Sequence, residues 1–360
     1  MGKYILIGIF LAQVFSTAVF AAQDYAYSIK FDWPKVKTPA LVKIDIENDA
    51  IIRETKCHRM HNNLSIDANG DVFVTRYKDV DFLGQQIDKY IAKDNKIIKV
   101  AETYGMGPLT VVPYQDRLFV LMYCRGDAYG KRRAASIEVL KKAGKNKYEF
   151  EKELILGTGT NTFSHQMDVD FNSKKIYVLA YRVLPAEEQY RSFIYEIDLE
   201  TASISREADL EVPGGVSGLA ISRDRKIYIS ATYWSYGMYR PKNDNIFVYS
   251  IDNFKLIRKI KTHILAKDLV YVADVDKLYV TYGAFGPHEP YIEVIDCKKD
   301  KVIGKIAVKH IKKLNYIGNN KLYVSSPGIG IYVIDVEQDK IIKTIPGQFS
   351  PISFDFSALK

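Results

Sequence analysis

The sequence predicts an all-β protein, and two observations carry this expectation. Short runs of β-branched and aromatic residues alternate with polar turns along the chain, and no run has the 3.6-residue period of a helix. One strand motif also recurs: a charged residue, an apolar residue, Tyr or Phe, and then Val or Ile. Its copies begin at Asp71, Arg117, Lys175, Lys226, Lys277 and Lys321, spaced by 46, 58, 51, 51 and 44 residues. A period of about 40–50 residues with four strands per unit is typical of a β-propeller.

Each repeat has the same expected plan of four antiparallel strands. An inner strand comes first, a polar hairpin turn follows, and the motif strand is second. The third strand ends in Ile-Asp in several repeats, and an outer strand completes the unit. We expect inner strands at residues 64–67, 109–112, 167–171, 219–222, 269–272 and 314–317, and outer strands at 204–210, 256–261, 302–308 and 341–345.

The two ends of the chain supply the last blade. Residues 25–57 contain three expected strands, and residues 350–358 contain an inner strand without the rest. Pairing the tail with the head would close the ring and remove an open sheet edge. We therefore expect one domain over residues 23–360, a seven-bladed β-propeller of four-stranded antiparallel blades closed by the N- and C-terminal strands. Six or eight blades are the alternatives if the ends are divided otherwise.

The first 22 residues have the pattern of a secretory signal peptide. Lys3 precedes an apolar run from Tyr4 to Phe15, and small residues end the segment at Ala21 and Ala22. The run is short for a bilayer span, and no later stretch is apolar enough to cross a membrane. We therefore expect an exported protein, secreted or periplasmic, and a monomer. The formal net charge of +8 is compatible with an anionic partner but does not require one.

Two repeats near the C-terminus carry the most specific pattern. One reads Tyr279-Val-Thr-Tyr282 followed by Tyr291-Ile-Glu-Val-Ile-Asp296, and the other reads Tyr323-Val-Ser-Ser326 followed by Ile331-Tyr-Val-Ile-Asp335. This pattern resembles the YVTN family of propeller repeats, although the first motif ends in Tyr and the second in Ser where the family has Asn. The resemblance implies a secreted, periplasmic or surface-exposed propeller, and many such proteins bind a partner without catalysis. It implies no catalytic residue, because the motif belongs to a strand.

All six histidines fall on connections that this strand assignment places on one face. These connections run from second to third strand and from an outer strand to the next inner strand, and propeller ligand sites gather there. The histidines are His58, His61, His165, His263, His288 and His310. We interpret them either as loop residues with local hydrogen bonds or as part of a pH-sensitive or metal-binding surface.

Three second-to-third-strand connections repeat a mixture of arginine and aromatic residues. The candidate ligand-binding residues there are Arg125, Tyr181, Arg182, Tyr233, Trp234, Tyr236 and Arg240. Guanidinium groups beside aromatic rings hold anions, stack on sugars or bases, and dominate protein–protein hot spots. Ordinary loop decoration in a tyrosine-rich chain is the alternative interpretation. Single-stranded nucleic acid would also fit, but the sequence contains no recognised nucleic-acid module.

The motifs that resemble metal or phosphate sites are incomplete. Cys57-His58-Arg59-Met60-His61 gathers soft donors, but an extended segment points its two histidines to opposite sides. Asp67-Ala-Asn-Gly-Asp71 begins like a calcium loop, yet Lys78 stands where the final Glu belongs, and Gly157-Thr-Gly-Thr lacks the Lys of a phosphate loop. We therefore expect no cofactor and no bound metal. At most one internal disulfide can form from the three cysteines, Cys57, Cys124 and Cys297.

These observations favour a non-enzymatic exported propeller. We expect it to bind a protein, a glycan or another anionic ligand through the face that carries the histidines, arginines and tyrosines. A metal-dependent propeller hydrolase of the lactonase type is the first alternative. Asp168 and Asp170 bracket an inner strand, and Ser217 stands where the metal-binding Asn of that family would be expected. A propeller subunit of a periplasmic redox complex is the second alternative.

Overall fold

The computed structural model describes residues 25–347 except for 31–38, 58–60, 68, 77–84, 106, 123–133, 158–161, 185–188, 232–243, 263–265, 283–290, 312 and 327. These residues form strands, turns and bends and no helix. Accordingly, this part of the chain has no helix that is long and apolar enough to cross a membrane. The signal peptide expected at residues 1–22 and the strand expected at residues 350–358 lie outside the described residues.

The described strands pair in chain order into seven antiparallel sheets. The first two sheets contain β1 (Tyr25–Lys30), β2 (Ala40–Asp45) and β3 (Ala50–Lys56), then β4 (His61–Ile66), β5 (Val72–Arg76), β6 (Gln86–Ile91) and β7 (Lys96–Glu102). The next two contain β8 (Pro108–Tyr114), β9 (Arg117–Met122), β10 (Ser136–Gly144) and β11 (Lys147–Ile155), then β12 (Thr162–Asp170), β13 (Lys175–Leu184), β14 (Gln189–Asp198) and β15 (Ser203–Leu210).

The remaining sheets follow the same plan. The fifth contains β16 (Val216–Ile221), β17 (Lys226–Ala231), β18 (Asn245–Ser250) and β19 (Leu256–Lys261). The last two contain β20 (Ala266–Val272), β21 (Lys277–Tyr282), β22 (Tyr291–Asp296) and β23 (Lys301–Ala307), then β24 (Lys313–Tyr316), β25 (Lys321–Ser326), β26 (Gly330–Asp335) and β27 (Lys340–Pro346).

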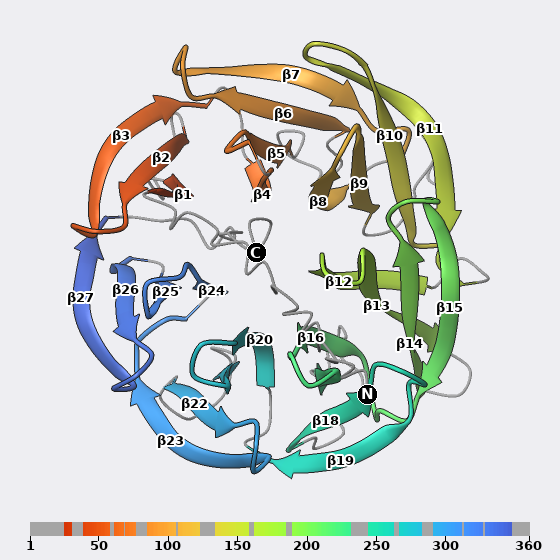
Figure 1. Ribbon diagram of the computed structural model, residues 1–360, viewed down its shortest axis with the longest axis vertical. Helices are drawn as coiled ribbons and strands as arrows, with labels where there is room; N and C mark the ends of the chain where they lie inside the picture. Colours follow the sequence, from red (N-terminus) through yellow and green to blue (C-terminus); the bar gives the residue numbers. More distant parts are fainter. Residues whose placement is uncertain are drawn as a thin grey trace, which may run out of the picture.

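The seven sheets stand as blades around a central axis, which confirms the predicted propeller (Figure 1). Each four-stranded blade begins with a strand near the axis and ends with a strand on the rim. The β1–β3 blade has three described strands, and β1 takes the second-strand position in it. Large apolar and aromatic side chains of neighbouring blades pack against each other, so the core lies between the blades rather than on the axis.

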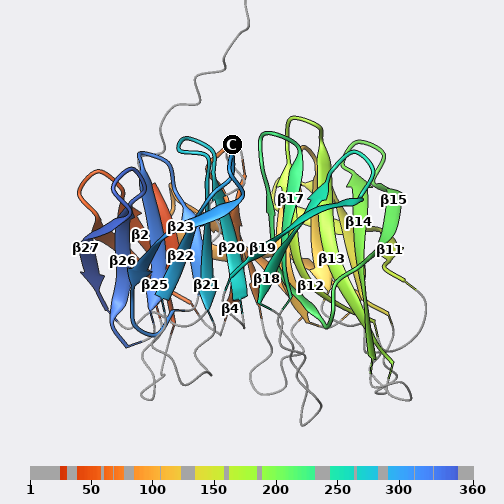
Figure 2. The same ribbon diagram turned by 90° about the horizontal axis from the view of Figure 1, so that it is seen from below.

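The two faces of the disc carry different connections (Figure 2). One face, which we call the hairpin face, carries the turns between first and second strands and between third and fourth strands, and it lies at the top of Figure 2. The opposite loop face carries the connections from second to third strand and from outer to next inner strand. On the hairpin face, aspartates at the end of the third strand accept hydrogen bonds from two N–H groups of the following turn, which explains the recurring Ile-Asp pair. These aspartates are Asp45, Asp198, Asp296 and Asp335.

The charged residue and the tyrosine of the strand motif bind the next blade. At three successive interfaces the lysine ammonium and the tyrosine hydroxyl both donate to one aspartate, and the lysine also donates to a backbone carbonyl of the same turn. The sets are Lys226 and Tyr228 with Asp300, Lys277 and Tyr279 with Asp339, and Lys321 and Tyr323 with Asp49. Each aspartate has a φ between 47° and 54°, a left-handed conformation that Asp tolerates better than most residues. We call this arrangement the interblade clamp.

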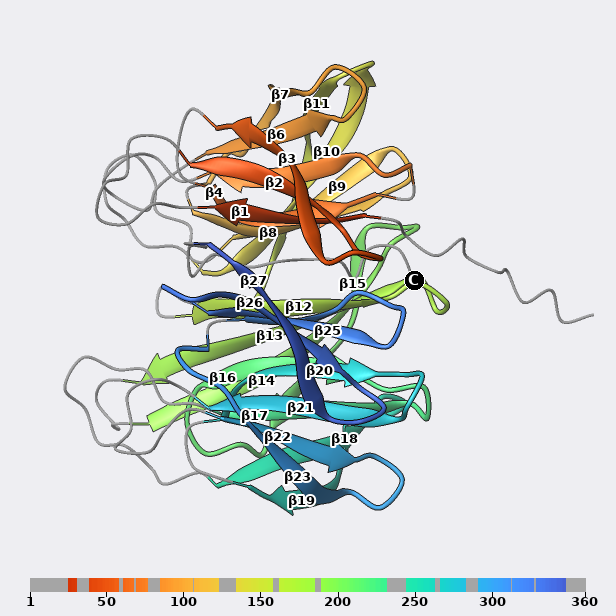
Figure 3. The same ribbon diagram turned by 90° about the vertical axis from the view of Figure 1, so that its left-hand side faces the viewer.

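The last interblade clamp closes the ring between the C-terminal and N-terminal blades. The Tyr323 hydroxyl lies 2.6 Å from Asp49 Oδ1, and Lys321 Nζ lies 2.9 Å from Asp49 Oδ2. Beneath this contact, Val333 and Ile345 of the last blade share one buried cluster with side chains of β1 and β2. Figure 3 shows β27 lying beside the β1–β3 blade. The ring therefore closes between segments that are far apart in the sequence.

The inner strands extend further toward the loop face than the sequence indicated. In five of the six described inner strands the ladder with the second strand contains a β-bulge near this end. His61 consequently lies in β4 and His165 lies in β12, at the bulge between Ser164 and Gln166, whereas we expected both to precede their strands. That expectation was wrong because the extra residue of a bulge breaks the two-residue alternation by which a strand is recognised.

A second bulge recurs in the outer strand of all seven described blades. In four blades the extra residue is an isoleucine whose side chain is about half exposed. These residues are Ile52, Ile257, Ile303 and Ile342. A bulge and neighbouring lysines on an edge strand hinder pairing with another chain, so the rim is protected against edge-to-edge aggregation.

Candidate functional site

The structure describes five of the thirteen predicted site residues. His58, Arg125, Tyr233, Trp234, Tyr236, Arg240, His263 and His288 lie outside the described residues. The other five occupy the loop-face ends of three blades. They are His61 at the start of β4, His165 in β12, Tyr181 and Arg182 near the end of β13, and His310 just before β24. The proposal that these residues bind a ligand stays a prediction, and the structure shows which of them lie together.

Tyr181 belongs to an aromatic stack at the loop-face end of the strand pair β13–β14. Strands β13 and β14 have ten residues each, longer than their counterparts in the other described blades. The Tyr181 ring stacks on Phe163 of β12 with centroids 5.6 Å apart, and it lies 6.0 Å from the ring of Tyr190. Tyr181 is only 8% exposed and packs toward the β16–β19 blade. Its ring therefore supports the β13–β14 strand pair. The ring of Tyr190 is partly exposed.

Two arginines flank one phenylalanine on the face of the β13–β14 strand pair opposite to Tyr181. Arg182 and Arg191 are cross-strand partners in the β13–β14 ladder, and each guanidinium carbon lies 5.7 Å from the centroid of the Phe193 ring. Arg191 also forms an ion pair with Asp209 of β15, and the Arg191 side chain is 54% exposed. Like charges directly opposite each other on an antiparallel ladder are destabilising. The Asp209 carboxylate offsets part of this electrostatic cost at Arg191.

Gly157 lets the chain pass close to Tyr195 of β14. The φ of Gly157 is +81°, and a Cβ atom there would lie 3.1 Å from the Tyr195 hydroxyl. Burial raises the pKa of Tyr195 to about 12, so the phenol stays neutral and packs as a neutral group. The glycine that resembled part of a phosphate loop thus has a packing role.

The other two described histidines lie elsewhere on the ring, His61 in β4 and His310 before β24. His310 is exposed, with a φ of 52°, in the connection from β23 to β24. Arg182 lies in the blade β12–β15, three blades earlier in the chain. The structure therefore does not bring His310 together with the arginine pair. Phe193 completes the cluster with the two arginines, and Phe163 supports Tyr181 on the other side. The sequence pattern did not reveal either residue, because candidate residues were sought in the connections, whereas both phenylalanines lie within strands.

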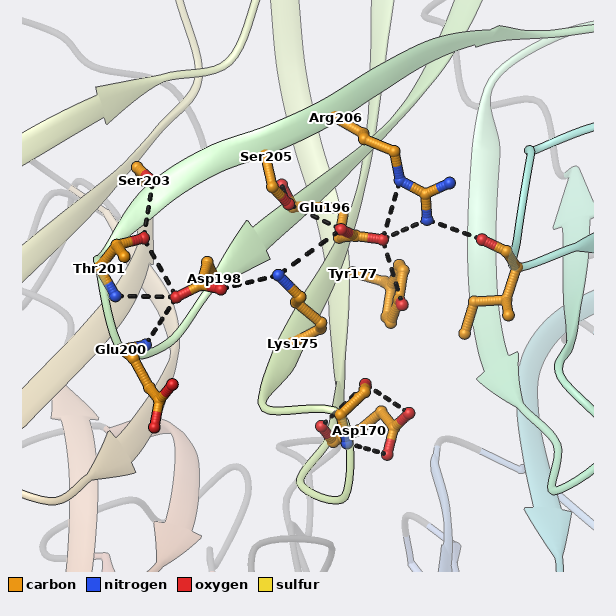
Figure 4. A network of polar contacts seen from close by, with 12 residues as sticks. Asp170, Lys175, Tyr177, Glu196, Asp198, Glu200, Thr201, Ser203, Ser205 and Arg206 are labelled. Atoms are coloured by element: carbon orange, nitrogen blue, oxygen red, sulfur yellow. Dashed lines mark hydrogen bonds and ion pairs between the residues drawn. The ribbon is translucent and has the colours of Figure 1, made fainter.

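A separate charged network occupies the hairpin face of the same blade (Figure 4). Lys175 donates to Asp198 at 2.7 Å and thereby holds the pKa of Asp198 at about 2. Burial opposes ionisation of Glu196, but hydrogen bonds from Arg206 and Ser205 hold the pKa of Glu196 below its usual value. These groups satisfy one another across adjacent strands. We therefore assign this network to stability rather than to ligand binding.

At the interface between the β12–β15 and β16–β19 blades, the aspartate of the interblade clamp is missing, and this network takes its place. Phe254 has the left-handed turn position that Asp300 and Asp339 have in later blades. Arg206 instead donates to the carbonyl of Ile251 at 2.7 Å, and its guanidinium lies 4.2 Å from the Phe254 centroid. A cation–π contact and a charge-assisted hydrogen bond thus take over from the carboxylate.

Two of the residues that suggested a metal-dependent hydrolase, Asp170 and Ser217, lie at opposite ends of the blades. Asp170 ends β12 at the hairpin face, where its carboxylate accepts hydrogen bonds from the Asn172 and Ser173 N–H groups. Ser217 lies near the start of β16, at the loop face, and its hydroxyl lies 2.9 Å from that of Ser230. Opposite ends of the blades cannot supply ligands to one ion.

No cluster of His, Cys, Asp and Glu in the described ranges could hold a metal ion. Cys57, which opens the Cys57–His61 segment, is 1% exposed and has a free thiol. Burial raises the pKa of this thiol to about 12, which disfavours the thiolate that a metal requires. Asp67 uses its carboxylate to accept hydrogen bonds from the Asn69 and Asp71 N–H groups, as a turn residue does.

No protein-family model matches this chain, and no curated protein matches it. Solved structures align over most of its length. A protein from Bacteroides fragilis NCTC 9343, provisionally described as a 6-phosphogluconolactonase, is 12% identical with a TM-score of 0.64, and the alignment covers 91% of this chain and 97% of that one. Hydrazine synthase from Kuenenia stuttgartiensis is 10% identical with a TM-score of 0.63, covering 89% and 98%.

A third similar structure is apo AztD from Citrobacter koseri. It is 14% identical with a TM-score of 0.54, and the alignment covers 92% of this chain and 97% of that one. Proteins of such different descriptions share the propeller architecture with this chain. At these identities the likeness shows the fold alone, since one fold serves many functions.

Proposed function

We propose that this chain is an exported, non-enzymatic propeller of the YVTN-repeat type that binds an acidic segment of a partner protein at its loop face. The observation that carries the proposal is the arginine pair Arg182 and Arg191, with the Phe193 ring against both guanidinium groups. The resemblance to YVTN repeats and the expected signal peptide support export. Sequencing the N-terminus of the purified protein tests the export step, and we expect it to start after Ala21 or Ala22.

Carboxylates suit this cluster better than neutral groups do. A guanidinium presents paired N–H donors that match the two oxygens of a carboxylate, and these charge-assisted bonds are stronger than neutral ones. The partly exposed ring of Phe193 offers rigid apolar area next to the charges. Arginine and aromatic side chains of this kind carry most of the energy in protein interfaces. An acidic segment with an apolar residue between its carboxylates would use both features.

Arginine substitution tests the proposal directly. The mature protein, immobilised, captures its partner from the native secreted or periplasmic fraction, and the same capture is repeated with Arg182→Ala and Arg191→Ala. Arg53→Ala is the matched control, because Arg53 is an exposed arginine of the rim strand β3. Against the captured protein, we expect each cluster variant to bind about 10- to 30-fold more weakly, as hot-spot residues worth roughly 1.4–2 kcal/mol do.

Ionic strength, loss of both arginines and removal of glycans each give a result that supports or contradicts the proposal. Capture through exposed charges weakens as ionic strength rises, because the Debye length falls. If a variant that carries both Arg182→Ala and Arg191→Ala captures the partner as well as the wild type does, the cluster is not the binding site. Loss of capture on deglycosylating the partner would instead identify a glycan and contradict the acidic segment.

A further inference from the structure

A second site lies at the loop-face ends of the inner strands β20 and β24, away from the arginine pair. The β20–β21 ladder pairs Ala266 with Tyr282 and then Leu269 with Val280, so Lys267 and Asp268 form a bulge. The Thr281 hydroxyl accepts a hydrogen bond from the Asp268 N–H at 3.0 Å, which holds the bulge in place. Bulges re-aim side chains, and they are over-represented at functional sites.

The negative charge of Asp268 is already balanced by a lysine of the next blade. Asp268 is 5% exposed, and its two oxygens accept from different groups of the next blade. Lys313 Nζ lies 3.1 Å from Oδ1, and the Leu314 N–H lies 3.0 Å from Oδ2. Asp268 therefore joins two blades and has its charge balanced by Lys313.

The neighbouring ammonium is left without such a partner. Lys267 is half-buried, and within the described part of the chain its Nζ atom forms no hydrogen bond or ion pair. Burial lowers the pKa of Lys267, Asp268 acts in the opposite direction, and the charge of Lys313 lowers the pKa further. Lys267, Lys313 and Asp268 together carry two positive charges and one negative charge, so one positive charge of this group is left without a carboxylate within the group.

The backbone of Lys267 is held from the adjacent blade. Its carbonyl accepts a hydrogen bond from the Ser230 hydroxyl at 3.2 Å. A Cβ atom on Gly218 would lie 2.8 Å from the same carbonyl, so only a glycine lets β16 approach this closely. Hydrogen bonding and close packing from the adjacent blade thus fix the backbone from which the Lys267 side chain extends, and sites built on rigid elements are more precise than sites on loops.

We propose that Lys267, assisted by Lys313, binds the oxyanion of a small molecule, a carboxylate or a phosphate group. A lysine ammonium is a compact point charge that holds either oxyanion without demanding a fixed geometry. The uncompensated charge supplies attraction, and partial burial strengthens the interaction relative to water. This site is separate from the acidic-segment site, because the arginine pair belongs to the β12–β15 blade and Lys267 to the β20–β23 blade.

The test titrates the purified mature protein with inorganic phosphate and with acetate at constant ionic strength and follows heat by calorimetry. Lys267→Met keeps most of the side-chain volume and removes the charge, so it should fold at least as well as the wild type. The matched control is Lys299→Met, because the Lys299 side chain is 72% exposed on the hairpin face. We expect Lys267→Met to bind at least about tenfold more weakly, the effect of losing one charge-assisted bond, and Lys299→Met to bind like the wild type.

Amine labelling gives a second readout. An acylating reagent, with mass spectrometry of the peptides, measures the reaction of Lys267 and Lys299 in the same sample. The proposal expects phosphate or acetate to slow labelling at Lys267 and not at Lys299. Protection by phosphate but not acetate identifies a phosphate group, and protection by both identifies a general oxyanion site. If the wild type binds neither anion, or if Lys267→Met binds as tightly as the wild type, the proposal is wrong.

Discussion

Replacing Tyr323 by phenylalanine removes one oxygen atom from the contact that closes the ring. The Tyr323 hydroxyl donates to Asp49 at 2.6 Å, and the tyrosine side chain is fully buried. Asp49 is 7% exposed and keeps its ion pair with Lys321 at 2.9 Å. The change therefore deletes a buried hydrogen bond to a charged group and leaves the apolar packing of the ring intact.

The expected cost follows from that contact. A buried hydrogen bond to a charged group contributes about 1.5–3 kcal/mol, so Tyr323→Phe should lower the free energy of unfolding by about 2 kcal/mol. The unfolding entropy of a chain of this length is about 0.7 kcal/mol/K, which converts the loss to a Tm decrease of about 3 °C. Urea denaturation measures the first quantity, and a thermal scan measures the second.

A matched variant separates ring closure from ordinary blade packing. The Tyr279 hydroxyl makes the equivalent contact with Asp339 at 2.5 Å, between blades that follow each other in the chain. Tyr279→Phe should cost a similar free energy. Only Tyr323→Phe should speed hydrogen exchange in β1 and β2, because the first and last blades are not consecutive in the chain and separate more easily.

Two results would refute this reasoning. A loss below about 0.5 kcal/mol for Tyr323→Phe would mean that the closing contact is worth no more than a surface substitution. Equal exchange in β1 and β2 for the two variants would mean that the seam opens no more readily than any other interface.

Three further predictions concern the described core. Gly218→Ala should destabilise the fold by about 1–3 kcal/mol in urea, since its Cβ would lie 2.5 Å from a serine hydroxyl, whereas Gly304→Ala, with open space around it, should stay within about 0.5 kcal/mol. Cys57 and Cys297 should resist a thiol reagent until the protein unfolds, because burial raises the pKa of each thiol to about 12; labelling of either one in the native protein would contradict this. Burial also raises the pKa of Tyr195 to about 12, and other buried tyrosines shift in the same direction, so their stabilising contribution is complete below the unfolded tyrosine pKa of about 10 and should be lost as pH rises through the folded pKa. Phenolate absorbance and urea midpoints measured together check this, and a midpoint that does not fall on the alkaline side would count against it.

The sequence alone predicted the architecture because the relevant signals are local. The motif strand beginning at Lys277 and the Ile-Asp pair ending at Asp296 each depend on a few adjacent residues. Alternation decides which residues form a strand, and a carboxylate that can accept two turn N–H groups decides where a hairpin starts. Repetition of these signals about every 50 residues then implied blades in a ring.

The candidate sites were predicted less well because their members meet only after folding. Tyr181 was named as a candidate ligand-binding residue, and only the structure shows that its ring packs against Phe163 and toward the next blade. The position of Lys267 depends on a bulge that no alternation pattern reveals, and the interblade role of Asp268 depends on a strand 45 residues later.

The local pattern of the sequence thus determined that this chain forms strands, hairpins and repeated blades. Only the tertiary structure decided that Asp49 receives the hydroxyl of Tyr323, 274 residues away, and that Arg182 faces Arg191 across a ladder. The physical reason is range: strand and turn preferences act between neighbours in the chain, whereas burial, charge pairing and close packing act between whichever groups the closed ring brings into contact.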